Sequence, residues 1–436
     1  MSHPHAHPVS PIDENHLLYG NFIGLQFVFE TPLDPNTLAQ AIQVLGLQFP
    51  ALSGYYKTTS ALVVPSRKSL SLKAQNCSDA LSDILRASSR PNFIYEPNRR
   101  KVLRGRAPLS TFTLTQFKGG TQIFGIAISH LLTDAAGYHM LIGHLSDIYS
   151  ALKSNKTPPN FPFNTHQHAF DFGTSRSKAE TLKDLKSRSL PKPIPIKGLF
   201  GKLIRSMIIR AMEKSLRDNP PIKIHFTLDQ IVSLKRTILA ESKEAWLSTN
   251  AVLCAHFTAI MAKLSYDDDI KTKMQIGQLL NLRSRYFEDK AQSQGRHVGN
   301  AILIHIENAS FDKGLQNTTR GELARYFKER QKRTTPKDVK DRLDLLSDAL
   351  RHGYTNPELD VKNPIISLNN QSKMHIYGAN FNGQHPAHIF PQDVGDNIMF
   401  FPAHDGGLDI FIRDIVNPMR QQKLLTPKWQ KRIFDF

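Results

Sequence analysis

The feature that constrains the fold most is an apolar run at residues 121–129 that ends in a histidine and then gives way to a helical pattern. Isoleucine and phenylalanine dominate the run, and the turn sequence Lys-Gly-Gly at 118–120 precedes it. This pattern predicts a buried strand that is entered from a hairpin turn. Behind His130, apolar side chains recur every three or four residues over 138–152, which predicts an amphipathic helix. The imidazole of His130 is therefore expected at the end of this strand, with its ring pointing into whatever cleft lies there.

His130 and Asp134 are spaced as His-x-x-x-Asp, at the corner where the expected strand gives way to the expected helix. Histidine has an unperturbed pKa of ~6.5, so it can accept a proton near neutral pH and give it back. An aspartate four residues later can hold the turn, pair with a cation or orient the ring. On these residues alone a structural reading stays open, in which His130 is a core histidine and Asp134 caps the following helix.

Residues 129–134, Ser-His-Leu-Leu-Thr-Asp, with Gly137 following, resemble the His-x-x-x-Asp-Gly signature of the BAHD acyltransferases. The wider superfamily includes nonribosomal peptide condensation domains and chloramphenicol acetyltransferase. Further short segments resemble other elements of the family and occur in the family's order. They are Ser-Pro-Ile-Asp at 10–13, Phe-Pro-Ala-Leu-Ser-Gly at 49–54, Leu-Ser-Thr-Asn-Ala at 247–251, Asn-Leu-Arg-Ser-Arg at 281–285 and Gly-Asn at 299–300.

The second signature of the family, Asp-Phe-Gly-Trp-Gly near the C-terminus, is altered in this chain. Residues 379–386 read Ala-Asn-Phe-Asn-Gly-Gln-His-Pro and keep only the phenylalanine and the later proline. Asn380 replaces the aspartate, and no tryptophan is present. Because this element is mostly structural in the family, the resemblance implies a divergent branch, and an oxyanion contact from the tryptophan cannot be carried over.

The expected fold class is α/β, with α+β layers of helices over sheets. The alternation at 110–117 predicts a strand that pairs with 121–129 as an antiparallel hairpin. The resemblance implies two chloramphenicol-acetyltransferase-like domains, each a mixed sheet covered by helices, with the active site in a channel between them. The expected parts are an N-terminal acyltransferase domain at 1–165 with the His-x-x-x-Asp motif, a basic crossover segment at 166–221 and a C-terminal acyltransferase domain at 222–436.

The second half repeats the alternation of strands and helices without repeating the sequence. Thr227 is expected to cap one helix, and Ser248 or Thr249 another. The other elements expected here are strands at 274–280 and 298–306, a helix at 338–350 and a closing hairpin around the turn at 405–407.

The formal net charge of +18 calls for a partner of opposite sign. No zinc-finger spacing, RNP-type aromatic motif or basic heptad helix is present, so no specific nucleic-acid partner is expected. The phosphates of CoA, an acidic carrier protein and an anionic membrane surface all fit the charge. A basic amphipathic helix at 198–217 suggests peripheral membrane contact, although such a helix also packs on a core or covers an apolar substrate pocket.

The location expected for the chain is the cytoplasm. The N-terminus has no apolar signal region, and no apolar run approaches the ~18–20 residues that a membrane span needs. Cys77 and Cys254 cannot form a disulfide framework and are expected to stay reduced. A complete site in one chain makes a monomer the simpler expectation.

The resemblance implies an acyl-CoA-dependent O- or N-acyltransferase that acts on a small-molecule acceptor. His130 is expected to be the general base, with no covalent acyl-enzyme, acyl-CoA as co-substrate and no permanently bound cofactor. Asp134 is expected to form a structural salt bridge with Arg283, and Gly137 to support the corner. Oxyanion stabilisation is expected from backbone N–H groups near this corner or from side chains. The possible oxyanion or substrate contacts are Asn300, Asn369 and Asn380.

Other interpretations stay open. His139 suggests a metal site with His130 and Asp134, but the strand-to-helix corner keeps these residues off one helical face, and no metal is expected. A condensation-type or carrier-protein-dependent acyltransferase is an alternative, although Ser129 stands where such domains have a second histidine. A catalytically inactive binding descendant is another, suggested by the altered C-terminal motif.

Overall fold

The computed structural model describes most of the chain, in two compact units. The described residues are 7–9, 13, 21–57, 62–64, 69–83, 93–160, 175–191, 193–195, 201, 203, 206–207, 210–211, 214, 218–267, 274–283, 297–308, 311, 314–360, 363–392, 395, 398–414 and 418–436. Unit 1 consists of Met1–Asp171, Phe287–Ala301 and Met374–Asp393; unit 2 consists of Phe172–Tyr286, Ile302–Lys373 and Val394–Phe436. Each unit therefore combines segments that are distant in the sequence.

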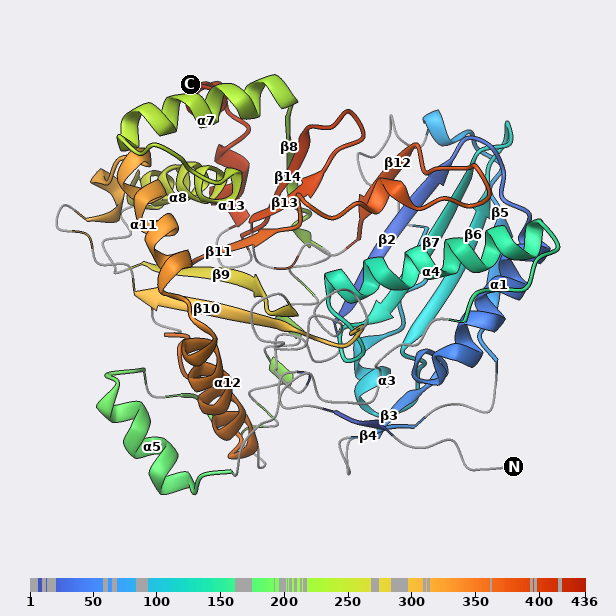
Figure 1. Cartoon of the computed structure of the whole chain (residues 1–436), viewed down its shortest axis with the longest axis horizontal. Coiled ribbons are helices and arrows are strands. Elements are labelled where there is room, and N and C mark those ends of the chain that lie inside the picture. Colours follow the sequence, from blue (N-terminus) through green and yellow to red (C-terminus); the bar gives the residue numbers. More distant parts are fainter. Residues whose placement is uncertain are drawn as a thin grey trace. The chain divides into compact units, whose positions relative to one another are not determined.

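Unit 1 is built on a five-stranded mixed sheet with β7 at its centre (Figure 1). The strand order is β12-β2-β7-β6-β5, with bounds β2 Phe22–Phe29, β5 Leu72–Asn76, β6 Ser110–Gln116, β7 Gln122–Ser129 and β12 His388–Pro391. β7 runs antiparallel to both β2 and β6, and all of its residues are buried. The buried strand expected at 121–129, and its hairpin with the preceding strand, are thus confirmed.

The helices of unit 1 follow from local capping and apolar periodicity. Helix α1, Pro35–Gln48, begins at Asp34, whose side chain accepts from the Thr37 amide. Helix α4, Ala135–Lys153, begins at Asp134 and packs against α1. The smaller elements are the helices α3 Arg99–Leu103, η1 Pro50–Ser53 and η3 Ile376–Gly378, and the three-stranded sheet of β1 His7–Pro8, β4 Leu62–Val64 and β3 Tyr55–Lys57.

Unit 2 is built on a six-stranded mixed sheet in the order β10-β9-β11-β13-β14-β8. The bounds are β8 Ile222–Phe226, β9 Gln275–Asn281, β10 Ile302–Asn308, β11 Ile365–Asn370, β13 Ile398–Pro402 and β14 Leu408–Ile412. β11 runs parallel to both of its neighbours, whereas the other pairs are antiparallel. The closing hairpin expected around 405–407 is confirmed as β13 and β14.

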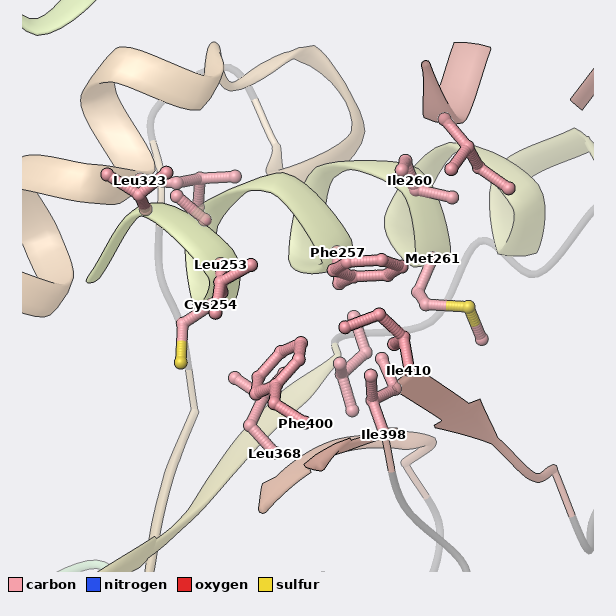
Figure 2. Close-up of a cluster of buried hydrophobic side chains, with 14 of the residues drawn as sticks. Leu253, Cys254, Phe257, Ile260, Met261, Leu323, Leu368, Ile398, Phe400 and Ile410 are labelled. Carbon is pink, nitrogen blue, oxygen red and sulfur yellow. The ribbon is translucent and has the colours of Figure 1, made fainter. Parts of the chain in front are cut away.

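Helix α8, Thr249–Asp267, forms the centre of the core of unit 2. Its apolar residues lie all around its axis, as expected of a helix buried on every side. Figure 2 shows Phe257 and Met261 of α8 above Ile398, Phe400 and Ile410 of the sheet. The other helices of unit 2 whose bounds the described residues give are α5 Lys178–Ser187, α7 Leu228–Ser242, η2 Leu315–Asn317, α11 Arg320–Arg333, α12 Pro336–Arg351, α13 Pro418–Lys423 and α14 Pro427–Ile433.

The expected helix caps of unit 2 are confirmed. Thr227 closes a capping box with Gln230 at the start of α7. Ser248 accepts from the Ala251 amide at the start of α8, at 3.1 Å. Two mixed sheets covered by helices confirm the expected fold class.

One expected strand begins later than its sequence pattern indicates. The pattern predicts a strand over 298–306, but β10 begins at Ile302. The preceding residues are bound to the strand-to-helix corner of unit 1: Thr133 Oγ1 donates to the Val298 carbonyl, and the Ala301 amide donates to Asp134. These bonds take the place of strand pairing.

The basic segment at 198–217 lies mostly outside the described residues. Within it, the described residues are helical, and the side chains of Leu203 and Met207 are exposed. The membrane contact expected there stays a prediction. Among the residues that the structure describes, no helix is long and apolar enough to cross a membrane.

Candidate active site

His130 directly follows β7, and its backbone is held on both sides. Its N–H donates to the carbonyl of Asn21 at 2.7 Å, and its carbonyl accepts from Asn300 Nδ2 at 2.7 Å. The side chain is half-buried. Because both backbone groups are fixed, the imidazole projects from a defined point at the end of a buried strand.

The amide of Asn300 also reaches the ring of His130. Asn300 Oδ1 lies 3.3 Å from His130 Nδ1, and Asn300 Nδ2 donates to Asp13 Oδ1 at 2.6 Å. The Asn300 side chain is buried, with the residue 5% exposed. The structure therefore brings together His130 and Asn300, a predicted oxyanion or substrate contact, and adds Asp13 to them.

Asp134 is fully buried, and both of its carboxylate oxygens accept backbone hydrogen bonds. Oδ1 accepts from the Gly137 amide at 2.9 Å, which caps α4. Oδ2 accepts from the Ala301 amide at 2.8 Å. One carboxylate thus ties the start of α4 to the segment that carries Asn300.

Gly137 allows this segment to come close to α4. A Cβ at this position would lie 1.9 Å from the Val298 carbonyl oxygen and 2.3 Å from Thr133 Oγ1. Thr133 Oγ1 also donates to the same Val298 carbonyl, at 2.7 Å. A side chain at 137 would therefore push the 297–301 segment away from the corner.

Some of the backbone N–H groups at the start of α4 already donate hydrogen bonds within the protein. The amide of Gly137 donates to the Asp134 carboxylate, and that of Tyr138 donates to the Asp134 carbonyl at 2.8 Å. These amides cannot also stabilise an oxyanion. The first-turn amides of Ala135 and Ala136 are the candidate donors at this corner, because the first turn of a helix has N–H groups without intrahelical partners.

The other predicted site residues lie elsewhere. Asn380 is in unit 1 and its carbonyl accepts from Ser150 Oγ, near the C-terminal end of α4. At 1.5 Å per residue, Ser150 is about 22 Å along α4 from its first residue. Arg283 and Asn369 belong to unit 2. The roles expected for Arg283, Asn369 and Asn380 stay predictions.

His139 lies in the second turn of α4, close to Asp134. Burial lowers the pKa of His139 to about 4, although the negative charge of Asp134 opposes this shift. The ring is therefore neutral at pH 7. The described residues contain no group of three or more histidine, cysteine or acidic side chains that could hold a metal ion.

Sequence reasoning assigned no role to two residues that contact this site, Asp13 and Asn21. Asp13 lies in the Ser-Pro-Ile-Asp segment that resembles the family's opening, so the resemblance was the available signal. Asn21 contributes a main-chain carbonyl just before β2, which no side-chain pattern indicates.

Solved structures of known proteins share this fold. F. sporotrichioides TRI101, complexed with coenzyme A and T-2, matches with a TM-score of 0.71 and 13% identity over 98% of both chains. Vinorine synthase matches with a TM-score of 0.66 and 13% identity over 96% of this chain and 92% of its own. The first condensation domain of the calcium-dependent antibiotic synthetase matches with a TM-score of 0.60 and 13% identity over 100% and 96% of the two chains. At 13% identity these matches show that the chain shares the fold of TRI101, vinorine synthase and the condensation domain.

The family itself is established from the sequence. The profile of the transferase family matches residues 76–421. The chain belongs to this family, which comprises the BAHD-type acyltransferases. No curated protein sequence matches the chain.

Proposed function

We propose that this protein transfers an acyl group from acyl-CoA to a hydroxyl or amine of a small-molecule acceptor, with His130 as general base. The observation that carries the proposal is the setting of His130. Its backbone is fixed at the end of β7, while its half-buried ring contacts Asn300. A ring held in this way can meet a substrate in one defined orientation.

In the proposed reaction, His130 removes a proton from the acceptor's O–H or N–H as that oxygen or nitrogen attacks the thioester carbonyl carbon. A new C–O or C–N bond forms, the C–S bond breaks, and the imidazolium returns the proton to the departing thiolate. No bond to the protein is needed. The hydroxyl of Ser129 supports this scheme, because it is fully buried and accepts from the Leu131 amide at 3.3 Å.

Asp134 has a supporting role in this proposal. Its two backbone hydrogen bonds favour a structural role over proton transfer. The salt bridge to Arg283 implied by the family is part of the proposal, since a carboxylate and a guanidinium form a geometrically specific pair.

Acyl-CoA is the proposed donor for two reasons. The net charge of +18 attracts the phosphates of CoA. TRI101 of F. sporotrichioides and of F. graminearum were solved with coenzyme A, the latter also with deoxynivalenol. Those ligands belong to those proteins, and they support CoA and a small acceptor for this one.

The test is release of free CoA thiol from acyl-CoA thioesters of increasing chain length, with pooled alcohol and amine acceptors. Turnover in the wild type should depend on an acceptor and disappear in His130→Ala, with an unchanged melting curve. The control is His375→Ala, which makes the same change at an exposed histidine of unit 1 and should keep full activity.

The other outcomes decide between the alternatives. Acceptor-dependent turnover that survives His130→Ala contradicts the assigned base. No thiol release from folded wild-type protein, but transfer from an acyl carrier protein, identifies a condensation-type enzyme. No transfer from either donor identifies a binding protein.

A further inference from the structure

Three segments of unit 1 that are far apart in the sequence meet through one side chain. Asn300 Nδ2 lies 2.6 Å from Asp13 Oδ1 and 2.7 Å from the His130 carbonyl oxygen, and Asn300 Oδ1 lies 3.3 Å from His130 Nδ1. The backbone around Asn300 is fixed on both sides, at Val298 by Thr133 and at Ala301 by Asp134. These bonds keep the Asn300 side chain next to His130.

The chemistry of the partners determines the orientation of the Asn300 amide. A carboxylate oxygen and a backbone carbonyl oxygen only accept hydrogen bonds, so the group that faces both of them must be the NH2. The amide oxygen then faces His130 Nδ1. This assignment follows from two short contacts of Nδ2 rather than from the shape of the side chain alone.

The orientation of the amide in turn selects the tautomer of His130. An amide oxygen only accepts, so the favoured partner is a protonated Nδ1, and the opposite tautomer would place two lone pairs against each other. Neutral His130 then carries its lone pair on Nε2. That nitrogen is the one that can remove a proton from an acceptor.

We infer that Asp13 is a positioning residue for acyl transfer, which acts by holding the Asn300 amide in the orientation that makes Nε2 of His130 the base. The inference rests on the proposed function for its catalytic meaning. The hydrogen bond between Asp13 and Asn300 is charge-assisted, and such bonds are roughly twice as strong as neutral ones. Without the carboxylate, the amide of Asn300 is held by one acceptor and rotates more easily.

The tautomer can be read directly by nitrogen-15 NMR of the full-length protein labelled at histidine. His130 is assigned by comparison with His130→Ala, and the spectrum reports which ring nitrogen is protonated in the neutral form. In the wild type we expect the proton on Nδ1. In Asp13→Ala we expect a measurable population with the proton on Nε2, and in Asn300→Leu a larger one.

Kinetics give the second measurement. We expect Asp13→Ala to lower kcat about 10- to 100-fold with little change in KM for acyl-CoA, because misorientation of a catalytic group costs rate at the chemical step. Asp13→Asn keeps an acceptor oxygen without the charge and should fall between the wild type and Asp13→Ala. The control is Asp79→Ala, at an exposed aspartate of unit 1, which should change neither the tautomer nor kcat.

The two measurements separate this inference from the proposed function. A wild-type His130 protonated on Nε2, or an unchanged tautomer in both Asp13→Ala and Asn300→Leu, overturns the inference even if acyl transfer is confirmed. Absence of acyl transfer in the wild type overturns the proposed function. In that case a tautomer shift in Asp13→Ala still establishes that Asp13 controls His130.

Discussion

Helix α4 begins in the His-x-x-x-Asp motif, and near its C-terminal end it contacts residues 379–386, the altered second motif; the two ends are held in different ways. At the N-terminal end, the fully buried Asp134 accepts two backbone hydrogen bonds, one of them from the segment of Asn300. At the C-terminal end, Ser150 Oγ donates to the Asn380 carbonyl at 3.0 Å and accepts from the Asn382 amide at 2.7 Å, both in exposed surroundings. The motif that matches the family is held by buried bonds, whereas the altered motif makes contacts that water can replace.

Phe381 is the exception at the C-terminal end. It is fully buried, and its ring lies 5.4 Å from Phe29, 6.2 Å from Phe124 and 5.6 Å from Tyr149, between centroids. The one aromatic residue kept from the second signature is therefore part of the core of unit 1. This explains how the rest of 379–386 can depart from the family's pattern while the fold is kept.

The largest expected effect is that of Phe381→Ala. Removing a buried aromatic ring should lower the free energy of unfolding by about 3–5 kcal/mol, through lost burial and a cavity. Denaturant unfolding measures this loss. The control is Asn380→Ala, whose side chain is exposed and should cost less than about 1 kcal/mol. Equal losses for the two variants would show that the second motif is not anchored by its phenylalanine.

Asp134→Ala should have the next largest effect and lower the free energy of unfolding by about 3 kcal/mol. It leaves the amides of Gly137 and Ala301 buried without their acceptor, and each such group costs about 1–3 kcal/mol. Ser150→Ala removes two exposed hydrogen bonds at the other end of α4 and should cost about 1 kcal/mol or less. An unchanged melting curve of Asp134→Ala together with lost activity would contradict the structural role of Asp134.

Gly137→Ala should cost about 2 kcal/mol, because the added methyl group collides with the Val298 carbonyl. It should also lower acyl transfer by displacing Asn300. Gly143 offers a matched control on the same helix, since a Cβ added there meets no described atom within 4 Å apart from its chain neighbours and the backbone of its own helix. Gly143→Ala should be neutral or stabilising by up to about 1 kcal/mol, because alanine has the higher helix propensity. Thermal unfolding of both variants tests whether the Val298 carbonyl lies close to Gly137.

A further expected effect concerns pH and the N-terminal end of α4. Because burial lowers the pKa of His139 to about 4, the unfolded chain binds a proton near pH 6.5 that the folded protein does not yet bind. The contribution of His139 to the free energy of unfolding is therefore fully present above pH 6.5 and is lost as the pH falls towards 4. His139→Gln should flatten this fall, measured as unfolding free energy at pH 7 and pH 5. An unchanged difference would show that His139 is not buried in the neutral form.

Local patterns in the sequence predicted β7, its hairpin with β6 and the caps of α7 and α8, and they left a cap of α4 by Asp134 open as an alternative. These features depend on neighbours within a few residues, so periodicity and capping residues specify them. The later start of β10 could not be predicted, because Val298 and Ala301 bind residues more than 160 positions away. The contact between Asp13 and Asn300 could not be predicted for the same reason. Both residues lie in segments that resemble the family, but they are far apart in the sequence and come into contact only in the folded protein.

Strand β12 has a consequence for the order in which the chain can fold. It pairs with β2, although His388 follows Phe29 by more than 350 residues. At about 5–20 residues per second, a ribosome needs roughly 20 to 70 seconds to travel between the two strands. During that time the outer edge of β2 lacks its native neighbour and resembles the unpaired strand edges that promote aggregation. Asn300 is also made late, so a nascent chain that already contains the His130 corner still lacks the residue that orients the histidine.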